Sequence, residues 1–450
     1  MIPNIELPFA SNPDLYEPEK FAAECDKLFA QRHQTFFDTV TGRYVLFHMD
    51  DIESNITDRD SSDTLDAETS PLIIAAHIVT LPSVYTLMRG VVPVTANAEG
   101  EVHDRVRRAL QANPHGLSPH APTITERYGK LVDDALKPLI KSLGHKALSR
   151  DGNKVDIVKD LASPLASSVI ARIQGASCHF DEQIQAFANG QTDLLGQQLR
   201  GNKLISAVRS LAGLLRFNNN LAKDAEKQLI FEPPSDLTTQ LVSELGRKLT
   251  RSAGMNLTAA GYSTTRGTIA NAVRFALADP SRELWQALCQ NENPYLQEVA
   301  LFEVERLCTA LVAWKGRLNK DTLLADNATK LPKGAPVLYA LGIANRDPKI
   351  FGYPHHALLQ RRVIDRERRG RARPHITYGR GPHACVGRTL AQLEIKAAFT
   401  ALGNLEKEHG AHFMLNEPET GFQYAPDSLF RMPENLPVVL TKNIATGEAI

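Results

Sequence analysis

The most informative segment of this 450-residue chain is Tyr378-Gly-Arg-Gly-Pro-His-Ala-Cys-Val-Gly387. It surrounds one cysteine, Cys385, with glycines, and apolar residues spaced three and four apart predict a helix directly after it. Glycine lets a backbone approach a large planar group, and the amide N–H groups at the start of a helix stabilise a thiolate. The segment therefore predicts a loop that presents an anionic sulfur as a metal ligand. The alternative is a glycine-rich turn with an incidental buried cysteine.

The composition excludes several other classes of protein. Hydrophobic residues make up 43% of the chain and charged residues 23%, which is typical of globular proteins. The 51 basic and 51 acidic residues balance, which argues against a nucleic-acid-binding or membrane-coating protein. The five cysteines are scattered and none forms a CxxC pair, so neither a disulfide framework nor a zinc finger is expected. We see no signal peptide and no membrane anchor, and we expect a cytoplasmic protein.

The pattern along the chain predicts one large domain, residues 1–450, mainly α with small β-sheets. The helical body is expected over about 100–310 and 387–405, and the strand-rich part over about 35–55, 317–342 and 412–441. Within the body, the periodicity predicts separate helices over 236–249 and 255–278. A further helix is predicted to begin near Gly387 and to end at Gly403, which would act as its C-cap.

The cysteine segment resembles the signature of the cytochrome P-450 family, the haem-thiolate monooxygenases, which reads Phe-Gly-x-Gly-x-His-x-Cys-x-Gly. Tyr378 stands where the family has Phe, and the matching residues are Gly379, Gly381, His383, Cys385 and Gly387. The resemblance implies that Cys385 is the proximal iron ligand of haem b, where a thiolate favours cleavage of dioxygen. It also implies that His383 meets a haem propionate and that Tyr378 packs beside the sulfur. The Tyr378 hydroxyl is a departure that is expected to tune the redox potential.

Other segments match the family in the same chain order. Glu303-Val-Glu-Arg306 looks like its Glu-x-x-Arg motif, which implies a structural ion pair. His103-Asp-Arg-Val-Arg107 is similar to its His-x-x-x-Arg motif, and Arg317 matches an arginine on a strand after Arg306. The resemblance implies that His103, Arg107 and Arg317 hold the haem propionates together with His383. Each of these motifs alone would read as ordinary surface charge.

Ala259-Ala-Gly-Tyr-Ser-Thr-Thr265 resembles the family's Ala-Gly-x-Asp/Glu-Thr-Thr segment on the long helix over the iron. The resemblance implies that Gly261 distorts this helix and that the Thr264 hydroxyl organises proton delivery. Ser263 replaces the family's acid, and a serine cannot act as a carboxylate in a proton relay. Ordered water, an acidic or hydroxyl group of the substrate, or an atypical reaction would then compensate. The alternative reading is a face of small residues that lets another helix approach.

Two further sets of residues bear on substrate and partner. By family position, the pocket for an apolar small molecule would draw on Val84 to Val94, Leu194 to Phe217, Val312 to Trp314, and Phe422 to Tyr424. The arginines between 361 and 373 would dock a separate acidic ferredoxin or flavodoxin, the alternative being a solvated face.

The sequence as a whole predicts a haem-thiolate monooxygenase that hydroxylates, cyclises or couples an apolar small molecule, in secondary metabolism. A peroxide-dependent enzyme of the same fold is the first alternative, because Ser263 replaces the acid. A catalytically silent recruitment module of the same fold is the second, and a helical binding protein without haem is the third.

Overall fold

The structure is a computed structural model. The residues that it describes are 2–7, 9, 12–31, 33–58, 62–63, 100–118, 122–148, 154–176, 181–196, 201–290, 292–370, 372–416, 422–425 and 429–442. The stretch Val84 to Val94, expected to line the substrate pocket, lies outside them.

Helices form most of the described chain. They are α2 (Pro18–Ala30), α3 (Met49–Thr57), α6 (Gly100–Gln111), α7 (Pro122–Ala147), α8 (Ser163–Ile173), α9 (Asp181–Gly196), α10 (Gly201–Gln228), α11 (Leu237–Ala278), α12 (Glu283–Cys289), α13 (Pro294–Leu307), α14 (Leu341–Ala344), α15 (Arg361–Arg369) and α16 (Arg388–His409). Short helical turns cover Pro13–Tyr16, Val158–Ala162 and Gly381–His383.

The strands form small sheets. They are β1 (Asn4–Ile5), β2 (Thr35–Asp38), β3 (Arg43–Leu46), β4 (Ser62–Asp63), β5 (Lys154–Asp156), β6 (Trp314–Leu318), β7 (Thr322–Leu323), β8 (Lys330–Leu331), β9 (Pro336–Tyr339), β10 (Ala411–Leu415) and β11 (Pro437–Lys442). The largest sheet has six strands in the order β1-β2-β3-β9-β6-β4, and β10-β11-β5 and β7-β8 form the others. In the large sheet β6 runs antiparallel to β9, with Trp314 opposite Tyr339.

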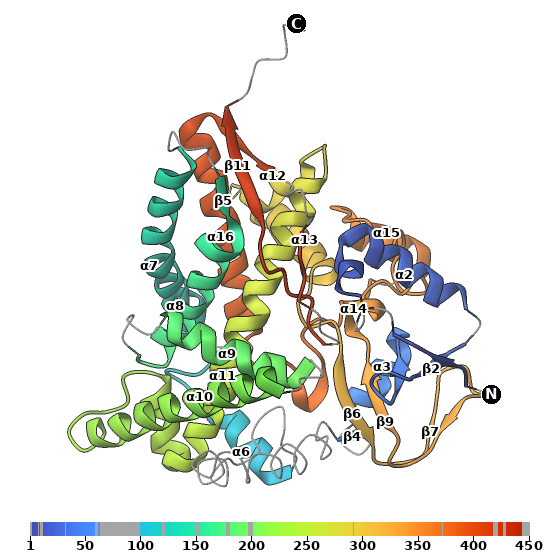
Figure 1. The fold of residues 1–450 in the computed structure, drawn as a ribbon, viewed down its shortest axis with the longest axis horizontal. Helices are drawn as coiled ribbons and strands as arrows, with labels where there is room; N and C mark the ends of the chain where they lie inside the picture. Colours follow the sequence, from blue (N-terminus) through green and yellow to red (C-terminus); the bar gives the residue numbers. More distant parts are fainter. Residues whose placement is uncertain are drawn as a thin grey trace, which may run out of the picture.

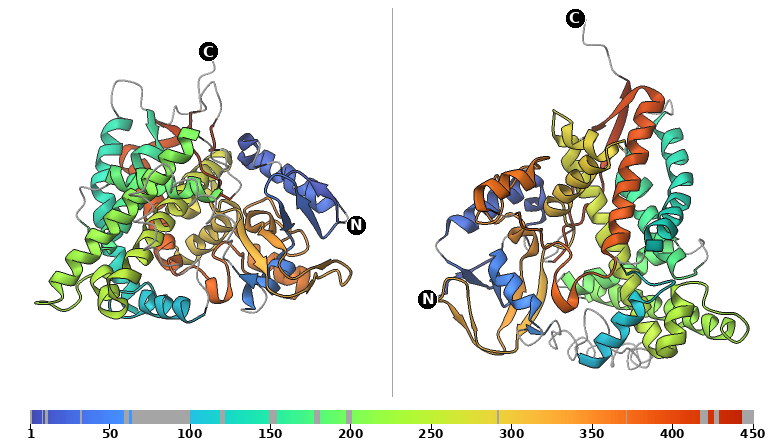
Figure 2. Two further views of the ribbon diagram at one scale, coloured as in Figure 1. Left: turned by 60° about the horizontal axis from the view of Figure 1, so that its bottom comes forward. Right: turned by 180° about the vertical axis from the view of Figure 1, so that it is seen from behind.

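The helices α6 to α11 gather on one side of the molecule, and the large sheet with α2 and α3 lies on the other (Figures 1 and 2). This arrangement confirms the predicted class of a mainly helical protein with small sheets. The strand-rich region expected over 35–55 is only partly correct, because Met49–Thr57 is a helix.

The central element is α11, whose 42 residues are buried along much of their length. A capping box starts it, since Asp236 Oδ1 accepts from the Thr239 amide at 2.9 Å while Thr239 Oγ1 accepts from the Asp236 amide at 3.0 Å. The two helices predicted here are two helical segments that meet at a kink, and the kink lies at Gly246 (φ 74°, ψ 164°) instead of between 249 and 255. Glycine adopts this backbone conformation without strain, so the chain resumes its helix immediately.

The predicted end of the last long helix at Gly403 is wrong. The helix α16 continues to His409 and is capped by Gly410 in the left-handed conformation (φ 56°). A Cβ atom on Gly403 would lie 2.4 Å from the Cβ atom of Cys289. Gly403 is therefore a contact glycine that lets α12 pack closely on α16.

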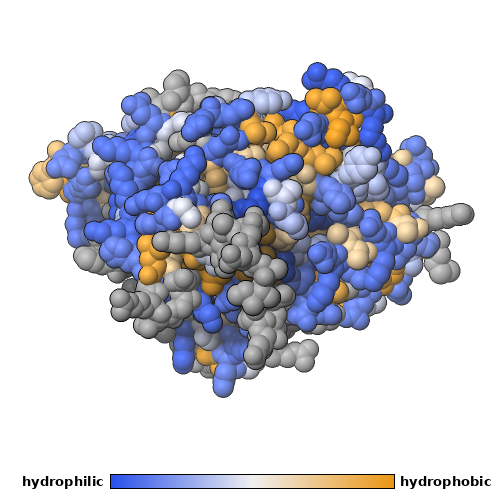
Figure 3. Space-filling view, turned by 90° about the horizontal axis from the view of Figure 1, so that it is seen from above, coloured by the Kyte–Doolittle hydropathy of each residue, from blue (hydrophilic) through white to orange (hydrophobic). Residues whose placement is uncertain are grey.

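None of the helices in the described ranges combines the length and the apolar character that a bilayer crossing requires. The face seen from above is largely hydrophilic, with the hydrophobic residues gathered in a few groups (Figure 3).

Candidate functional site

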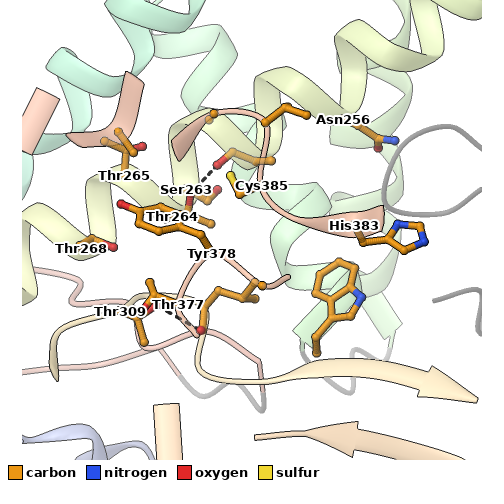
Figure 4. Close-up of a pocket in the computed structure, with 18 of the residues that line it drawn as sticks. Asn256, Ser263, Thr264, Thr265, Thr268, Thr309, Thr377, Tyr378, His383 and Cys385 are labelled. Atoms are coloured by element: carbon orange, nitrogen blue, oxygen red, sulfur yellow. Dashed lines mark hydrogen bonds between the residues drawn. The ribbon is translucent and has the colours of Figure 1, made fainter. Parts of the chain in front are cut away.

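A cavity of about 330 Å³ lies between α11, the cysteine loop and the large sheet. Its polar and reactive lining residues among those described are Asp58, Gln191, Thr192, Asn256, Ser263, Thr264, Thr265, Thr268, Thr309, Thr377, Tyr378, Arg380, His383, Cys385 and Glu394. Figure 4 shows that the hydroxyl side chains of α11 lie around the same space as Cys385 and His383. Most of the remaining lining is aliphatic or aromatic, so the cavity suits an apolar ligand with a few polar groups.

The cysteine loop is shaped by two glycines. Gly379 and Gly381 have positive φ angles of 61° and 66°. A Cβ atom on Gly381 would lie 2.7 Å from the carbonyl oxygen of Ile56 in α3, so glycine is also required there for close packing. The Cys385 amide donates to the Tyr378 carbonyl at 2.8 Å, which closes the loop.

The Cys385 thiol is accessible from the cavity. Burial of the sulfur by the surrounding protein raises the pKa of this thiol, while the amides of Gly387 and Arg388 and the charge of Arg107 act in the opposite direction. These amides belong to the start of α16, as the sequence predicted. A bound metal ion deprotonates a coordinating thiol, so the donor set fits a metal centre.

Three of the four residues expected at the propionates come together beside this loop. The rings of His103 and His383 are 4.5 Å apart, centroid to centroid. Arg107 Nη1 donates to the carbonyl oxygen of Ala384 at 2.7 Å, which ties α6 to the loop. His383 lines the cavity directly.

The fourth residue, Arg317, donates from Nη1 to the carbonyl oxygen of Gly334 at 2.7 Å, and its place at the propionates stays a prediction. Side chains alternate along a strand, so Arg317 lies on the opposite face of β6 from Trp314, which does line the cavity. Arg380, which the sequence reasoning passed over, lines the cavity and donates to the Pro374 carbonyl at 2.9 Å. In the sequence, the position of Arg380 between Gly379 and Gly381 could have pointed to this role.

The hydroxyl groups of Ser263 and Thr264 are already hydrogen-bonded within the protein. Thr264 Oγ1 donates to the Ala260 carbonyl at 2.7 Å. Ser263 Oγ lies 2.7 Å from Thr192 Oγ1, which donates in turn to the Ala188 carbonyl at 3.0 Å (Figure 4). Ser263 therefore joins α11 to α9, where the family pattern would have an acid.

Gly261 keeps helical dihedral angles, and its role in distorting the helix over the iron stays a prediction. Within α11 only Gly246 departs from helical dihedral angles. A Cβ atom on Gly261 would lie 2.8 Å from Cδ1 of Ile170. Gly261 thus lets α8 pack against α11, and it also lines the cavity.

The ion pair of Glu303 and Arg306 is fully buried. Arg306 donates from Nε to Glu303 Oε1 at 3.0 Å and from Nη2 to Oε2 at 2.9 Å. Arg361 adds a second guanidinium, with its Nη2 at 3.1 Å from Glu303 Oε2. Burial opposes the ionisation of Glu303, but the two arginines outweigh it, and the pKa of Glu303 lies below its ordinary value.

The arginine run between 361 and 373 is therefore not one solvated patch. Arg361 is buried in the Glu303 ion pair, and Arg373 pairs with Asp50 and Glu53. Three arginines of the run are described as exposed, namely Arg362, Arg366 and Arg368. The docking role expected of the whole run is thus wrong for Arg361, whose charge is needed inside the protein.

Glu394 is a site residue that the sequence reasoning missed. It lies on α16 four residues after Leu390, lines the cavity, and is only 2% exposed. Burial raises the pKa of its carboxyl group well above the ordinary value. A charged residue on the apolar face of a predicted helix was the available signal.

The expected pocket stretches are only partly correct. Trp314 lines the cavity, but Phe422 and Tyr424 pack into the hydrophobic core. Gln191 and Thr192 line it just before the stretch expected from Leu194, and Phe430 lines it beyond Tyr424.

Comparison with known proteins gives consistent results. The family model described as cytochrome P-450 matches residues 222–402. The biotin biosynthesis cytochrome P-450 of Bacillus subtilis (strain 168) is 28% identical over 329 residues, which cover 70% of this chain and 74% of that protein. Luteothin monooxygenase of Streptomyces thioluteus is 28% identical over 326 residues, which cover 70% of this chain and 75% of that protein. Among solved structures, P450BioI in complex with an acyl carrier protein ligated to hexadec-9Z-enoic acid is similar with a TM-score of 0.75 and 21% identity, over 95% of this chain and 100% of that chain.

Proposed function

This chain belongs to the cytochrome P-450 family, and we propose that it is a monooxygenase in which Cys385 binds the iron of haem b and the cavity above it binds an apolar small molecule. The observation that carries the proposal is the position of Cys385, whose thiol opens into a cavity lined on another side by the hydroxyl residues of α11. Apolar residues form most of the cavity wall, which favours a substrate with hydrocarbon or aromatic surface.

The residues around the cavity fit haem. Cys385 is the exposed one of the four cysteines that the structure describes and would supply the iron ligand, and the start of α16 supplies amides to that sulfur. His103, Arg107 and His383 gather on one side of the loop, where they would hold the two propionates through charge-assisted hydrogen bonds. Haem bound here supplies the activation of dioxygen and the oxidation of the substrate.

The polypeptide positions the substrate and moves protons. Thr264 is the hydroxyl that would hold and pass a proton at Oγ1, after exchanging its present bond to Ala260 for one to water or substrate. Ser263 Oγ stays engaged with Thr192, so it orients α9 over the cavity and adds no acid. We infer that a polar group of the substrate assists proton delivery in place of the missing carboxylate.

Two further parts of the proposal are the metabolic role of the protein and its electron donor. The relatives include luteothin monooxygenase of Streptomyces thioluteus and pentalenolactone synthase of Streptomyces exfoliatus, and these names support a role in secondary metabolism. A separate ferredoxin or flavodoxin would supply the electrons, with exposed arginines of α15 as its docking site.

The decisive test is the spectrum of the reduced protein with carbon monoxide. We expect the strongly red-shifted Soret band of a thiolate-ligated haem in the wild type, and its loss in Cys385→Ala. Cys308→Ala is the matched control, because Cys308 is a buried cysteine outside the described cavity lining. A red-shifted band that persists in Cys385→Ala would contradict the assignment.

A further inference from the structure

A second buried carboxylate lies on the same helix as the Glu303 ion pair. Glu305 on α13 is only 1% exposed. Glu303 is neutralised by Arg306 and Arg361, whereas the described side chains that contact the Glu305 carboxylate carry no guanidinium or ammonium group.

Three donors from the proximal side of the site converge on Glu305. Tyr378 donates its hydroxyl to Oε1 at 2.7 Å, and Gln392 Nε2 donates to Oε2 at 3.2 Å. His375 Nε2 lies 3.2 Å from Oε2 and donates there. The other ring nitrogen of His375 is buried and has no hydrogen-bond partner among the described residues.

Tyr378 connects this carboxylate to the cysteine loop. Its ring lines the cavity, and its carbonyl accepts the amide of Cys385 at 2.8 Å. Burial and the neighbouring Glu305 raise the pKa of Tyr378 well above its ordinary value, so the phenol remains the donor. The nearest cation over its ring is Arg388, with Cζ 5.5 Å from the ring centroid, and Arg388 is exposed to solvent.

We propose that the Glu305 carboxylate, held against the proximal loop by Tyr378, lowers the reduction potential of the haem bound at Cys385. The inference rests on the proposed function, because it needs haem at Cys385. Glu305 and Tyr378 are positioning residues here, since neither coordinates the iron.

The physical reason is electrostatic. One-electron reduction of ferric to ferrous haem adds one negative charge to the site. A buried carboxylate without a fixed cationic partner opposes that addition, and the low dielectric of the interior strengthens the effect. The ferric state is therefore favoured over the ferrous state.

The test measures the reduction potential of the haem-loaded protein by spectroelectrochemical titration. Glu305→Gln removes the charge and keeps the size and an acceptor oxygen. We expect about a tenfold higher ratio of ferrous to ferric haem at a fixed applied potential, which corresponds to about 59 mV for a one-electron couple. Glu298→Gln is the matched control, because Glu298 is a 55% exposed carboxylate on the same helix, and its ratio should change less than about twofold.

The outcomes separate this inference from the proposed function. A wild type without the red-shifted band of thiolate ligation overturns both. A normal band in both proteins with an unchanged potential in Glu305→Gln overturns only the role of Glu305. If Glu305→Gln does not retain haem, the double variant Glu305→Leu/Tyr378→Phe, which removes both partners of the hydroxyl–carboxylate bond, is titrated instead. Should that variant also lose haem, the cluster is a structural element of the pocket and the tuning role is rejected.

Discussion

At the scale of single residues, binding of the haem propionates depends on which cationic side chains lie beside the cysteine loop. Arg107 donates to Ala384, the neighbour of Cys385, whereas Arg317 is directed toward Gly334 on the other face of β6. The family resemblance placed both at the propionates. Side chains alternate along β6, so Arg317 lies on the opposite face of that strand from Trp314, and an interval counted along the sequence does not reveal this.

Arg107→Ala should therefore lose more haem than Arg317→Ala. Removing Arg107 deletes a charge beside the expected propionates and a bond that ties α6 to the cysteine loop. The measurement is the ratio of haem to protein after purification, with Arg108→Ala, an exposed neighbour on α6, as control. If Arg317→Ala loses as much haem as Arg107→Ala, Arg317 also holds a propionate and this prediction is wrong.

Glu394 gives a residue-scale prediction about pH. Its carboxyl pKa is raised well above 4.5 by burial, so the folded protein keeps a proton that the unfolded chain releases. The contribution of Glu394 to stability then falls as pH rises above about 4.5, by up to about 1.4 kcal/mol per pH unit until the folded-state pKa is passed. Glu394→Gln has no proton to lose there. The melting temperature of Glu394→Gln minus that of the wild type should increase from pH 5 to pH 8. A difference that stays constant across this range would contradict the prediction.

At the scale of elements, α13 and α15 are joined by a buried network that sequence reasoning identified only in part. Glu303 and Arg306 were predicted from their spacing on one helix, and the structure confirms that they pair. Arg361 was grouped with exposed arginines, because its partner is 58 residues away along the chain. Local charge density does not tell which arginine of a run is buried.

Arg361→Ala should destabilise the folded protein strongly. It leaves Glu303 with one buried partner fewer, and breaking a buried ion pair costs about 3–5 kcal/mol. Arg362→Ala changes the adjacent, exposed arginine of the same helix and should cost less than about 0.5 kcal/mol. Chemical denaturation of both variants measures the difference. Similar midpoints would show that Arg361 adds nothing to the buried network around Glu303.

The elements that were predicted well have strong local signals. The long helices follow from apolar periodicity, and the cysteine loop follows from its glycines. The end of α16 was missed because Gly403 serves a contact with Cys289, and the break in α11 was displaced because Gly246 interrupts a helix that then continues. Both glycines are visible in the sequence, but their roles are not. The role of Gly403 depends on its contact with Cys289, and that of Gly246 depends on its backbone angles. The same holds for Ser263, whose partner Thr192 lies 71 residues earlier.

At the scale of the whole molecule, the balanced charge limits how an electron donor is recruited. With 51 basic and 51 acidic residues, the net charge offers no long-range attraction, so steering must come from a local patch. Arg362, Arg366 and Arg368 on α15 are the exposed arginines of the run that remain for this task. Arg362 and Arg366 lie four residues apart and share one helix face.

Reversing Arg362 and Arg366 to Glu should slow the first electron transfer from a reduced acidic ferredoxin at low ionic strength, because like charges then meet at the docking face. A slowing of about tenfold at low salt should shrink toward none at high salt, where exposed charges are screened beyond a few ångströms. Reversing Lys137 and Lys141, exposed residues four apart on α7, makes the same change in net charge at another place. Stopped-flow reduction distinguishes the two pairs, and reduction by a small reductant should be equal in both. If both double variants slow the ferredoxin reaction equally, net charge alone governs the encounter and α15 is not the docking face.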